Sequence, residues 1–178
     1  SKRINRKLKS IGEAPVIYDP YLTFQSEKEL QKKMKQKGYM DAQVTSSVEF
    51  RKKKAKVTYD ITPNKPYIIG EIKNNFNIDY KIDSIMKERG GWTNSKIKTN
   101  NLFDIDVLDD ERERIATYLR RRGYYNFSRE NISFLADSSI GNHKIDLSIQ
   151  LKPLTKSLGN GNTETIEYKP YKIKHINI

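Results

Sequence analysis

Hydrophobic positions along the chain follow a helical period and then a strand period, and this succession occurs twice. Leu30 and Met34 lie four residues apart, so they share one face of a helix. Ile115 and Leu119 repeat that spacing 85 residues later (115 − 30 = 85). In both copies a Gly-Tyr pair follows the helix, and alternating apolar residues follow the pair. The pattern predicts two copies of a unit in which a helix leads into a β-hairpin.

The ends of both helices carry capping signals. Ser26 and Glu29 have the spacing of a capping box, and Asp109–Glu111 place negative charge where a helix start favours it. The glycine after each helix suits the left-handed conformation that ends helices. We therefore interpret the glycine and tyrosine pairs as structural helix stops rather than client contacts: Gly38, Tyr39, Gly123 and Tyr124.

The strands are predicted from period-two alternation. In the first copy, alternate residues from Ala42 to Phe50 are more apolar than their neighbours, and Val57, Tyr59 and Ile61 form the return strand. The turn between these strands is basic: Arg51, Lys52, Lys53 and Lys54. In the second copy Ile132 and Phe134 alternate, residues 137–142 make a turn, and residues 145–151 return.

A second repeat, Lys-Pro-Tyr, begins at Lys65 and at Lys169, an offset of 104. Each copy predicts the start of a strand, and the excess over 85 falls mostly in residues 154–166, a Gly/Asn/Thr-rich stretch that predicts a flexible loop. Between the first Lys-Pro-Tyr and the second Gly-Tyr helix, Asp79 caps a further predicted helix, which ends at Gly90. A connector follows over residues 94–106. Its apolar pair, Leu102 and Phe103, is expected to face inward.

These elements predict an α+β fold built from tandem βααββ modules. Residues 1–64 form a module without its first strand, with a helical stretch near residues 4–11. Residues 65–153 form a complete module, and residues 154–178 form the loop and the first strand of a following module.

Composition narrows the chemistry. Hydrophobic residues make up 35% of the 178 residues, which suits small cores better than one large core. Cysteine is absent, which excludes disulfides, zinc-thiolate sites and thiol nucleophiles. The sequence has no apolar run of membrane-spanning length and no signal-peptide pattern at its start. His143 and His175 lack nearby catalytic partners in the sequence, and the acidic residues of 104–110 lack calcium-loop spacing. We expect no enzyme activity, no metal and no cofactor.

The order strand, helix, helix, strand, strand, with Gly-Tyr at the second helix end and Pro-Tyr at the next unit's start, resembles POTRA domains of BamA/TamA-like outer-membrane protein assembly factors. Residues 12–19 and 37–44 look most like the TamA-like branch. The resemblance implies modules with a three-stranded mixed sheet and two helices on one face. It also implies a periplasmic location, attached to the bacterial outer membrane through a C-terminal barrel that this chain does not contain.

The resemblance further implies that unfolded outer-membrane protein clients, or accessory assembly proteins, add a strand to the first strand of each hairpin. The client-binding residues implied in this way are Val44, Ser46, Val48, Phe50, Ile132 and Phe134. A structural spacer or docking arm that contacts envelope partners is an alternative within the same family.

The net charge of +12 favours binding to polyanions but does not identify which polyanion the chain binds. The basic turn Arg51–Lys54 is interpreted first as a solvated hairpin tip, with contact to anionic lipid headgroups as an alternative. A basic nucleic-acid-binding module is the alternative from a different class, which we do not favour. Steep salt dependence of binding would mark it.

Overall fold

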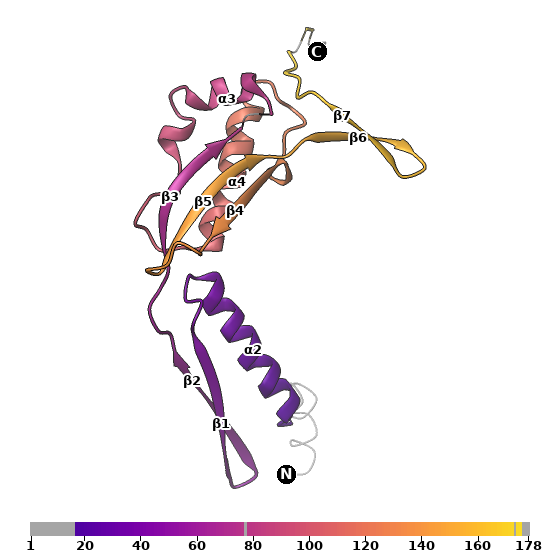
Figure 1. Cartoon of the computed structure of the whole chain (residues 1–178). Coiled ribbons are helices and arrows are strands. Elements are labelled where there is room, and N and C mark those ends of the chain that lie inside the picture. Colours follow the sequence, from indigo (N-terminus) through magenta and orange to yellow (C-terminus); the bar gives the residue numbers. More distant parts are fainter. Residues whose placement is uncertain (1–16, 77, 173, 176–178) are drawn as a thin grey trace. The chain divides into compact units, whose positions relative to one another are not determined.

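The computed structural model describes residues 17–76, 78–172 and 174–175 (Figure 1). Contacts divide the chain into two compact units. The first unit comprises Ser1–Lys32 and Gln43–Thr62, and the second comprises Lys33–Ala42 and Pro63–Ile178. The helix predicted near residues 4–11 lies outside the described residues.

The first unit contains most of helix α2 (Pro20–Gln36) and the antiparallel pair β1 (Gln43–Arg51) and β2 (Lys54–Thr62). The predicted hairpin is confirmed, including its tip, where Lys52 and Lys53 adopt positive φ. The predicted capping box is wrong. Helix α2 begins with a proline, which is favoured in a first turn, and the Asp19 carboxylate accepts the Tyr21 N–H at 2.8 Å. Ser26 lies inside the helix, where its hydroxyl donates to the Leu22 carbonyl.

The second unit confirms the predicted order of strand, helix, helix, strand, strand. It runs β3 (Ile68–Asn75), α3 (Tyr80–Lys87), a short 3-10 turn η1 (Trp92–Asn94), α4 (Ile105–Arg120), η2 (Arg129–Asn131), β4 (Ile132–Asp137) and β5 (Lys144–Leu151). The sheet has the order β3-β5-β4. Strand β3 is parallel to β5 and β4 is antiparallel to it, so the sheet is mixed. Helices α3 and α4 lie on one face of this sheet (Figure 1).

The core of the second unit lies between this sheet and the two helices. Its fully buried side chains include Phe76, Ile82, Met86, Ile115, Leu119, Ile132, Leu147 and Ile149. The helical spacing of 115 and 119 and the alternation in β5 therefore predicted the buried faces correctly. By contrast, the only buried residue of the first unit among its described positions is Thr23, which is 8% exposed.

The starts of α3 and α4 show which acidic residues cap them. Asp79 caps α3 as predicted, and its carboxylate accepts the N–H groups of Lys81 and Ile82. The predicted start of α4 at residues 109–111 is wrong, because the helix begins at Ile105 with Asp104 as its cap. The connector was half correct: Phe103 is buried, whereas Leu102 is 39% exposed.

Both predicted helix stops are confirmed. Gly38 and Gly123 have φ values of +88° and +93°. In each case the following tyrosine donates its N–H to the carbonyl five residues earlier, Tyr39 to Met34 at 3.0 Å and Tyr124 to Leu119 at 3.2 Å. This is the Schellman pattern that closes helix ends.

The flexible loop predicted over residues 154–166 is wrong. These residues form a hairpin of β6 (Leu154–Gly159) and β7 (Asn162–Ile166), which extends away from the rest of its unit in Figure 1. Its turn, residues 159–161, has positive φ throughout. The first strand predicted after Pro170 falls partly outside the described residues, and its described members, Tyr171, Lys172, Lys174 and His175, are not in a strand.

Candidate functional site

The two edges of the three-stranded sheet in the second unit differ in how they are covered. Strand β4 lies at one edge and pairs with β5 through an uninterrupted register from Ile132 to Asp137. It contains no lysine, proline or bulge, which are the features that commonly protect an exposed edge. No described strand pairs with the outer side of β4, so its outward backbone groups can accept another strand.

The opposite edge, β3, is covered by its own chain at the start of the strand. The Ile69 N–H donates to the Asn101 carbonyl at 2.8 Å, and the Asn100 N–H donates to the Ile69 carbonyl at 2.7 Å. The register of β3 then shifts between Ile69 and Ile72, where the Asp146 carboxylate accepts the Glu71 N–H at 2.6 Å. A bulge and a covering segment both discourage strand addition, so β4 is the more accessible edge.

The hairpin of the first unit leaves more backbone unpaired. Among the described residues its sheet has only β1 and β2, paired without a bulge from Gln43↔Thr62 to Arg51↔Lys54. Each strand therefore has an outer side with no described partner. The predicted client edge β1 is one of these two sides.

The six predicted client-contact side chains differ widely in exposure. Phe50 is 70% exposed and makes an edge-to-face contact with Tyr18, whereas Val44, Ser46 and Val48 are half-buried. Ile132 is fully buried, and the half-buried Phe134 packs against the core. In β4, therefore, a client would meet the backbone and the exposed Leu135 rather than these two side chains. Successive side chains of a strand point to opposite faces, so Ile132 and Phe134, two residues apart, both face the core.

An apolar groove adjoins the hairpin of the first unit. It has a volume of about 900 Å³ and lies between the start of α2 and one face of the hairpin. Apolar and aromatic side chains line much of it, including Leu22, Phe50, Val57 and Tyr59. Exposed strand edges beside apolar side chains are the combination that an extended, unfolded chain can use.

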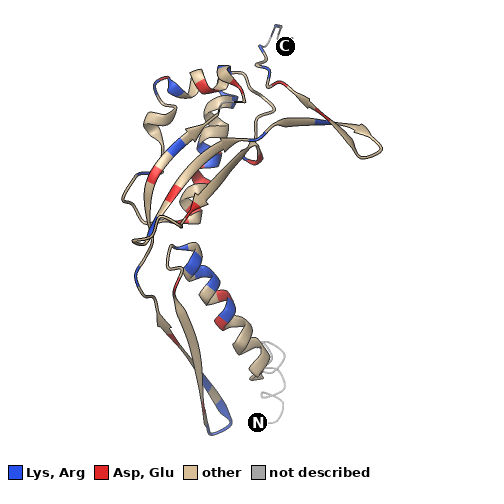
Figure 2. Ribbon diagram, in the orientation of Figure 1, with Lys and Arg blue, Asp and Glu red and all other residues tan. Residues whose placement is uncertain are grey.

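The hairpin tip is a separate, basic surface. Arg51, Lys52, Lys53 and Lys54 are all exposed, and Figure 2 shows them gathered where β1 turns into β2. None of the ion pairs in the described part of the chain involves them. The interpretation as a solvated tip is compatible with this exposure, and so is contact with an anionic surface.

A second charged cluster lies where the end of α2 and the residue after it, Lys37, meet the start of α4. The Lys37 ammonium lies 2.8 Å from the Asp104 carboxylate and 2.7 Å from that of Asp106, and Lys33 lies 3.3 Å from Asp106. Hydrogen bonds to Asp104 and then Asp106 raise the pKa of Lys37. Hydrogen bonds from Lys37 and then Lys33 lower the pKa of Asp106. Lys37 and Asp106 are thus both charged at neutral pH.

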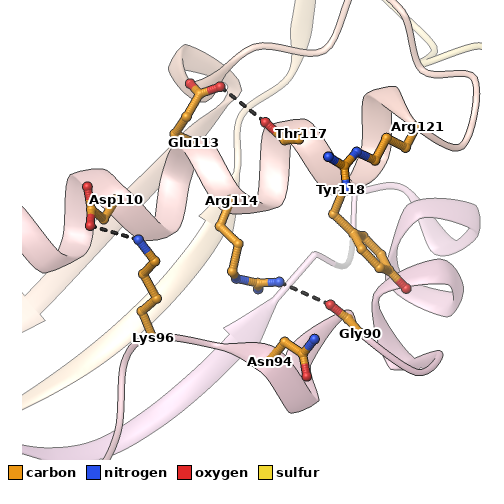
Figure 3. A pocket seen from close by; sticks show the side chains of 9 residues that line it. All are labelled: Gly90, Asn94, Lys96, Asp110, Glu113, Arg114, Thr117, Tyr118 and Arg121. Carbon is orange, nitrogen blue, oxygen red and sulfur yellow. Dashed lines mark hydrogen bonds and ion pairs between the residues drawn. The ribbon is translucent and has the colours of Figure 1, made fainter.

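A hollow of about 430 Å³ lies beside α4 and is lined by polar and charged side chains (Figure 3). Lys96 pairs with Asp110 at 2.7 Å, and the Arg114 guanidinium donates to the Gly90 carbonyl at 3.1 Å. No histidine or serine lines the hollow, and its one hydroxyl beside a carboxylate is that of Thr117, which donates to Glu113 at 3.2 Å. The lining charges mostly brace the loop after α3 against α4.

Of the two histidines, His143 is half-buried in the turn between β4 and β5, and His175 is exposed. His143 lies 4.0 Å from the Asp41 carboxylate and 5.1 Å from the Tyr67 ring. The described residues contain no group of acidic and histidine side chains that could hold a metal ion. A search of the same residues finds no helix with the length and apolarity needed to cross a membrane.

The described residues form two α+β units in which strands β1 and β4 each have an outer side without a described partner. Residues 3–64 match the POTRA family model, described as a surface antigen variable number repeat. This match confirms the POTRA resemblance for the first predicted module, and the mixed sheet with two helices confirms the predicted fold class in the second. A search of curated proteins finds no match.

Two solved structures from Haemophilus are similar at low sequence identity. The crystal structure of BamA from Haemophilus ducreyi lacking POTRA domains 1–3 is 12% identical, with a TM-score of 0.43, over 84% of this chain and 26% of that chain. The structure of Haemophilus influenzae BamA POTRA3-5 is 14% identical, with a TM-score of 0.38, over 83% of this chain and 54% of that chain. The chain thus spans 26% and 54% of these two chains.

Proposed function

We propose that this chain is a periplasmic POTRA segment of an outer-membrane β-barrel protein assembly or translocation factor of the TamA-like branch, and that it acts by binding rather than catalysis. The observation that carries the proposal is the outer edge of β4, which has no described partner, at the opposite side of the sheet from β3, whose edge residues 100–102 cover at Ile68 and Ile69. Its partners would be unfolded outer-membrane protein clients or accessory assembly proteins. The POTRA match over residues 3–64 supports the family.

Strand addition suits such a client because the edge offers backbone groups. A client strand that pairs with β4 or β1 gains main-chain hydrogen bonds whatever its side chains are. Ordering the client costs about 1–2 kcal/mol per residue, so one short edge should bind weakly. Several edges in series raise the effective concentration of each next site. Weak, sequence-tolerant binding is what a factor that handles many clients requires.

The test is a backbone NMR titration of the isotope-labelled chain with an extended peptide from a β-barrel precursor. We expect shifts along Ile132–Asp137 and Gln43–Arg51. Lysine at Leu135, which is 59% exposed on the edge, should weaken binding because a charge on an edge strand opposes pairing. The matched control is lysine at Ile140, which is 45% exposed in the following turn. Shifts that avoid both strands, or equal effects of the two lysines, would contradict strand addition.

A spacer or docking arm predicts a different response to a strand-breaking residue. Val48 lies within β1, opposite Val57 of β2. Proline there removes a backbone donor from the strand. A spacer should keep its partner contact when Val48 is replaced by proline, whereas a strand-adding site should lose peptide binding. A circular dichroism spectrum of the variant shows whether the hairpin is retained.

The exposed basic tip supports a second candidate role, contact with anionic lipid headgroups. Each basic residue near such a surface contributes about 1 kcal/mol. Vesicles containing phosphatidylglycerol should co-sediment the chain at low salt, and replacing residues 51–54 by serine should abolish this. A gel shift with DNA or RNA at low salt separates this role from nucleic-acid binding, which would show a steep salt dependence. Co-sedimentation that survives the serine replacement contradicts a role for the tip.

A further inference from the structure

The two sequence repeats meet in space, and they meet in the same way twice. The Tyr67 N–H donates to the Gly38 carbonyl at 2.8 Å, and the Tyr171 N–H donates to the Gly123 carbonyl at 2.7 Å. Each Gly-Tyr helix stop therefore accepts a hydrogen bond from the Lys-Pro-Tyr segment that follows it along the chain. The repeated unit is a joint between a helix end and the start of the next strand.

At Gly38 a third segment completes the joint. The Phe103 N–H donates to the Tyr67 carbonyl at 3.0 Å, and a Cβ atom added to Gly38 would collide with the Phe103 carbonyl. The next residue, Asp104, accepts from Lys37, which directly precedes the glycine. The third segment thus supplies a buried aromatic ring and then a carboxylate at the start of a helix.

At Gly123 the place of this third segment is open. The three atoms nearest to a Cβ atom there belong to Tyr171 and Pro170, whereas at Gly38 the nearest atom belongs to Phe103. In the same place lies a hollow of about 680 Å³, lined by Arg120–Arg122, Gly123, Tyr125, Tyr171 and Lys172. Four cations line it, and no carboxylate does.

The charges of this hollow are only partly neutralised. Arg120 pairs with Glu113 at 2.7 Å, and Arg122, which stands at the repeat position of Lys37 (37 + 85 = 122), lies 3.6 Å from Glu88. Arg121 and Lys172 have no ion pair among the described residues. Tyr125 is 76% exposed and Tyr171 is 60% exposed, so apolar surface is available as well.

We propose that the hollow at Gly123 is a docking site for a segment with the chemistry of Leu102–Asp106: apolar side chains, then carboxylates that begin a helix. Its source would be the module that follows along the parent chain, in the place that Leu102–Asp106 takes at Gly38. Charge complementarity and the repeated hydrogen bond both favour this occupant over a flat membrane surface. The proposal rests on the tandem-module part of the proposed function.

The experiment uses the chain's own third segment as the probe. An acetylated and amidated peptide of residues 100–108, whose only charged residues are Asp104 and Asp106, is titrated into the labelled 178-residue chain. We expect amide shifts at residues 120–125 and 171–172 with affinity in the millimolar range, because no linker raises the effective concentration. A peptide with both aspartates changed to asparagine should bind about fivefold more weakly.

Variants of the protein complete the test. Arg121→Glu should weaken peptide binding about fivefold, while Arg129→Glu, a matched change at an exposed arginine outside the hollow, should not. No shift near Gly123 at about 5 mM peptide overturns the proposal. So does equal binding of the asparagine peptide, or Arg121-dependent binding of phosphatidylglycerol vesicles without peptide binding. Shifts confined to β1 or β4 would overturn the docking site while supporting strand addition.

Discussion

Replacing Gly38 by alanine tests the joint directly, since both its backbone angle and its surroundings exclude a side chain. The φ of +88° alone costs an L-residue about 1–2 kcal/mol. The added methyl group would also collide with the Phe103 carbonyl, which is backbone and cannot rotate away. Overpacking of this kind typically adds about 1–3 kcal/mol. We therefore expect Gly38→Ala to lower the free energy of unfolding of the second unit by about 2–5 kcal/mol.

Gly141 provides the matched control. Its φ is +75°, so alanine meets the same backbone penalty, but apart from its chain neighbours nothing lies within 4 Å of the added Cβ. Gly141→Ala should cost only about 1–2 kcal/mol. Urea unfolding followed by tryptophan fluorescence measures both, because the single tryptophan, Trp92, packs against Phe76 in the second unit. Equal losses for the two variants would refute the close approach of the third segment to Gly38.

Two further predictions concern buried polar groups. Glu111 is fully buried and accepts two hydrogen bonds from Arg114. Glu111→Ala should therefore lower the free energy of unfolding in urea by about 3–5 kcal/mol. The control, Glu113→Ala at an exposed ion pair, should lower it by at most about 1 kcal/mol. A loss no larger than that of Glu113→Ala would contradict a buried pair. Burial raises the pKa of Tyr168, whose hydroxyl donates to the Lys152 carbonyl, to about 12. Above about pH 10 the unfolded state loses a tyrosine proton that the folded state still holds, so the free energy of unfolding should fall as the pH rises towards the folded pKa. Unfolding measured across alkaline pH should show this fall, and Tyr168→Phe should remove it.

Local periodicity predicted the elements well because the side chains themselves determine it. The helical spacing of Ile115 and Leu119 and the alternation in β5 both mark buried faces in the structure. Helix starts were harder to predict, since Ser26 and Glu29 have capping-box spacing and yet lie inside α2. A pattern of two residues cannot distinguish a cap from a helix interior in which a serine bonds to a carbonyl one turn back.

The accessible edge of the sheet was only partly predictable. Alternation showed that β4 has one buried face, but strand addition uses the backbone, which alternation does not describe. The edge of β3 is covered by residues 100–102, and that cover depends on how a connector folds back over 30 residues of chain. The sequence analysis predicted a loop where β6 and β7 form a hairpin. The glycines at 159 and 161, between threonine-rich segments, are a turn signal that could have predicted the hairpin.

The joint explains why that hairpin must exist. The Gly-Tyr and Lys-Pro-Tyr repeats have offsets of 85 and 104, so the second joint has 19 more residues between its strand and its Lys-Pro-Tyr segment (104 − 85 = 19). Both joints nevertheless close with the same hydrogen bond, so the extra residues must leave and return at one point. The base of the hairpin meets this condition, because Leu154 pairs with Ile166 and the Tyr168 hydroxyl donates to the Lys152 carbonyl at 2.7 Å. An antiparallel hairpin is the simplest path that satisfies the backbone of an insertion whose two ends are held together.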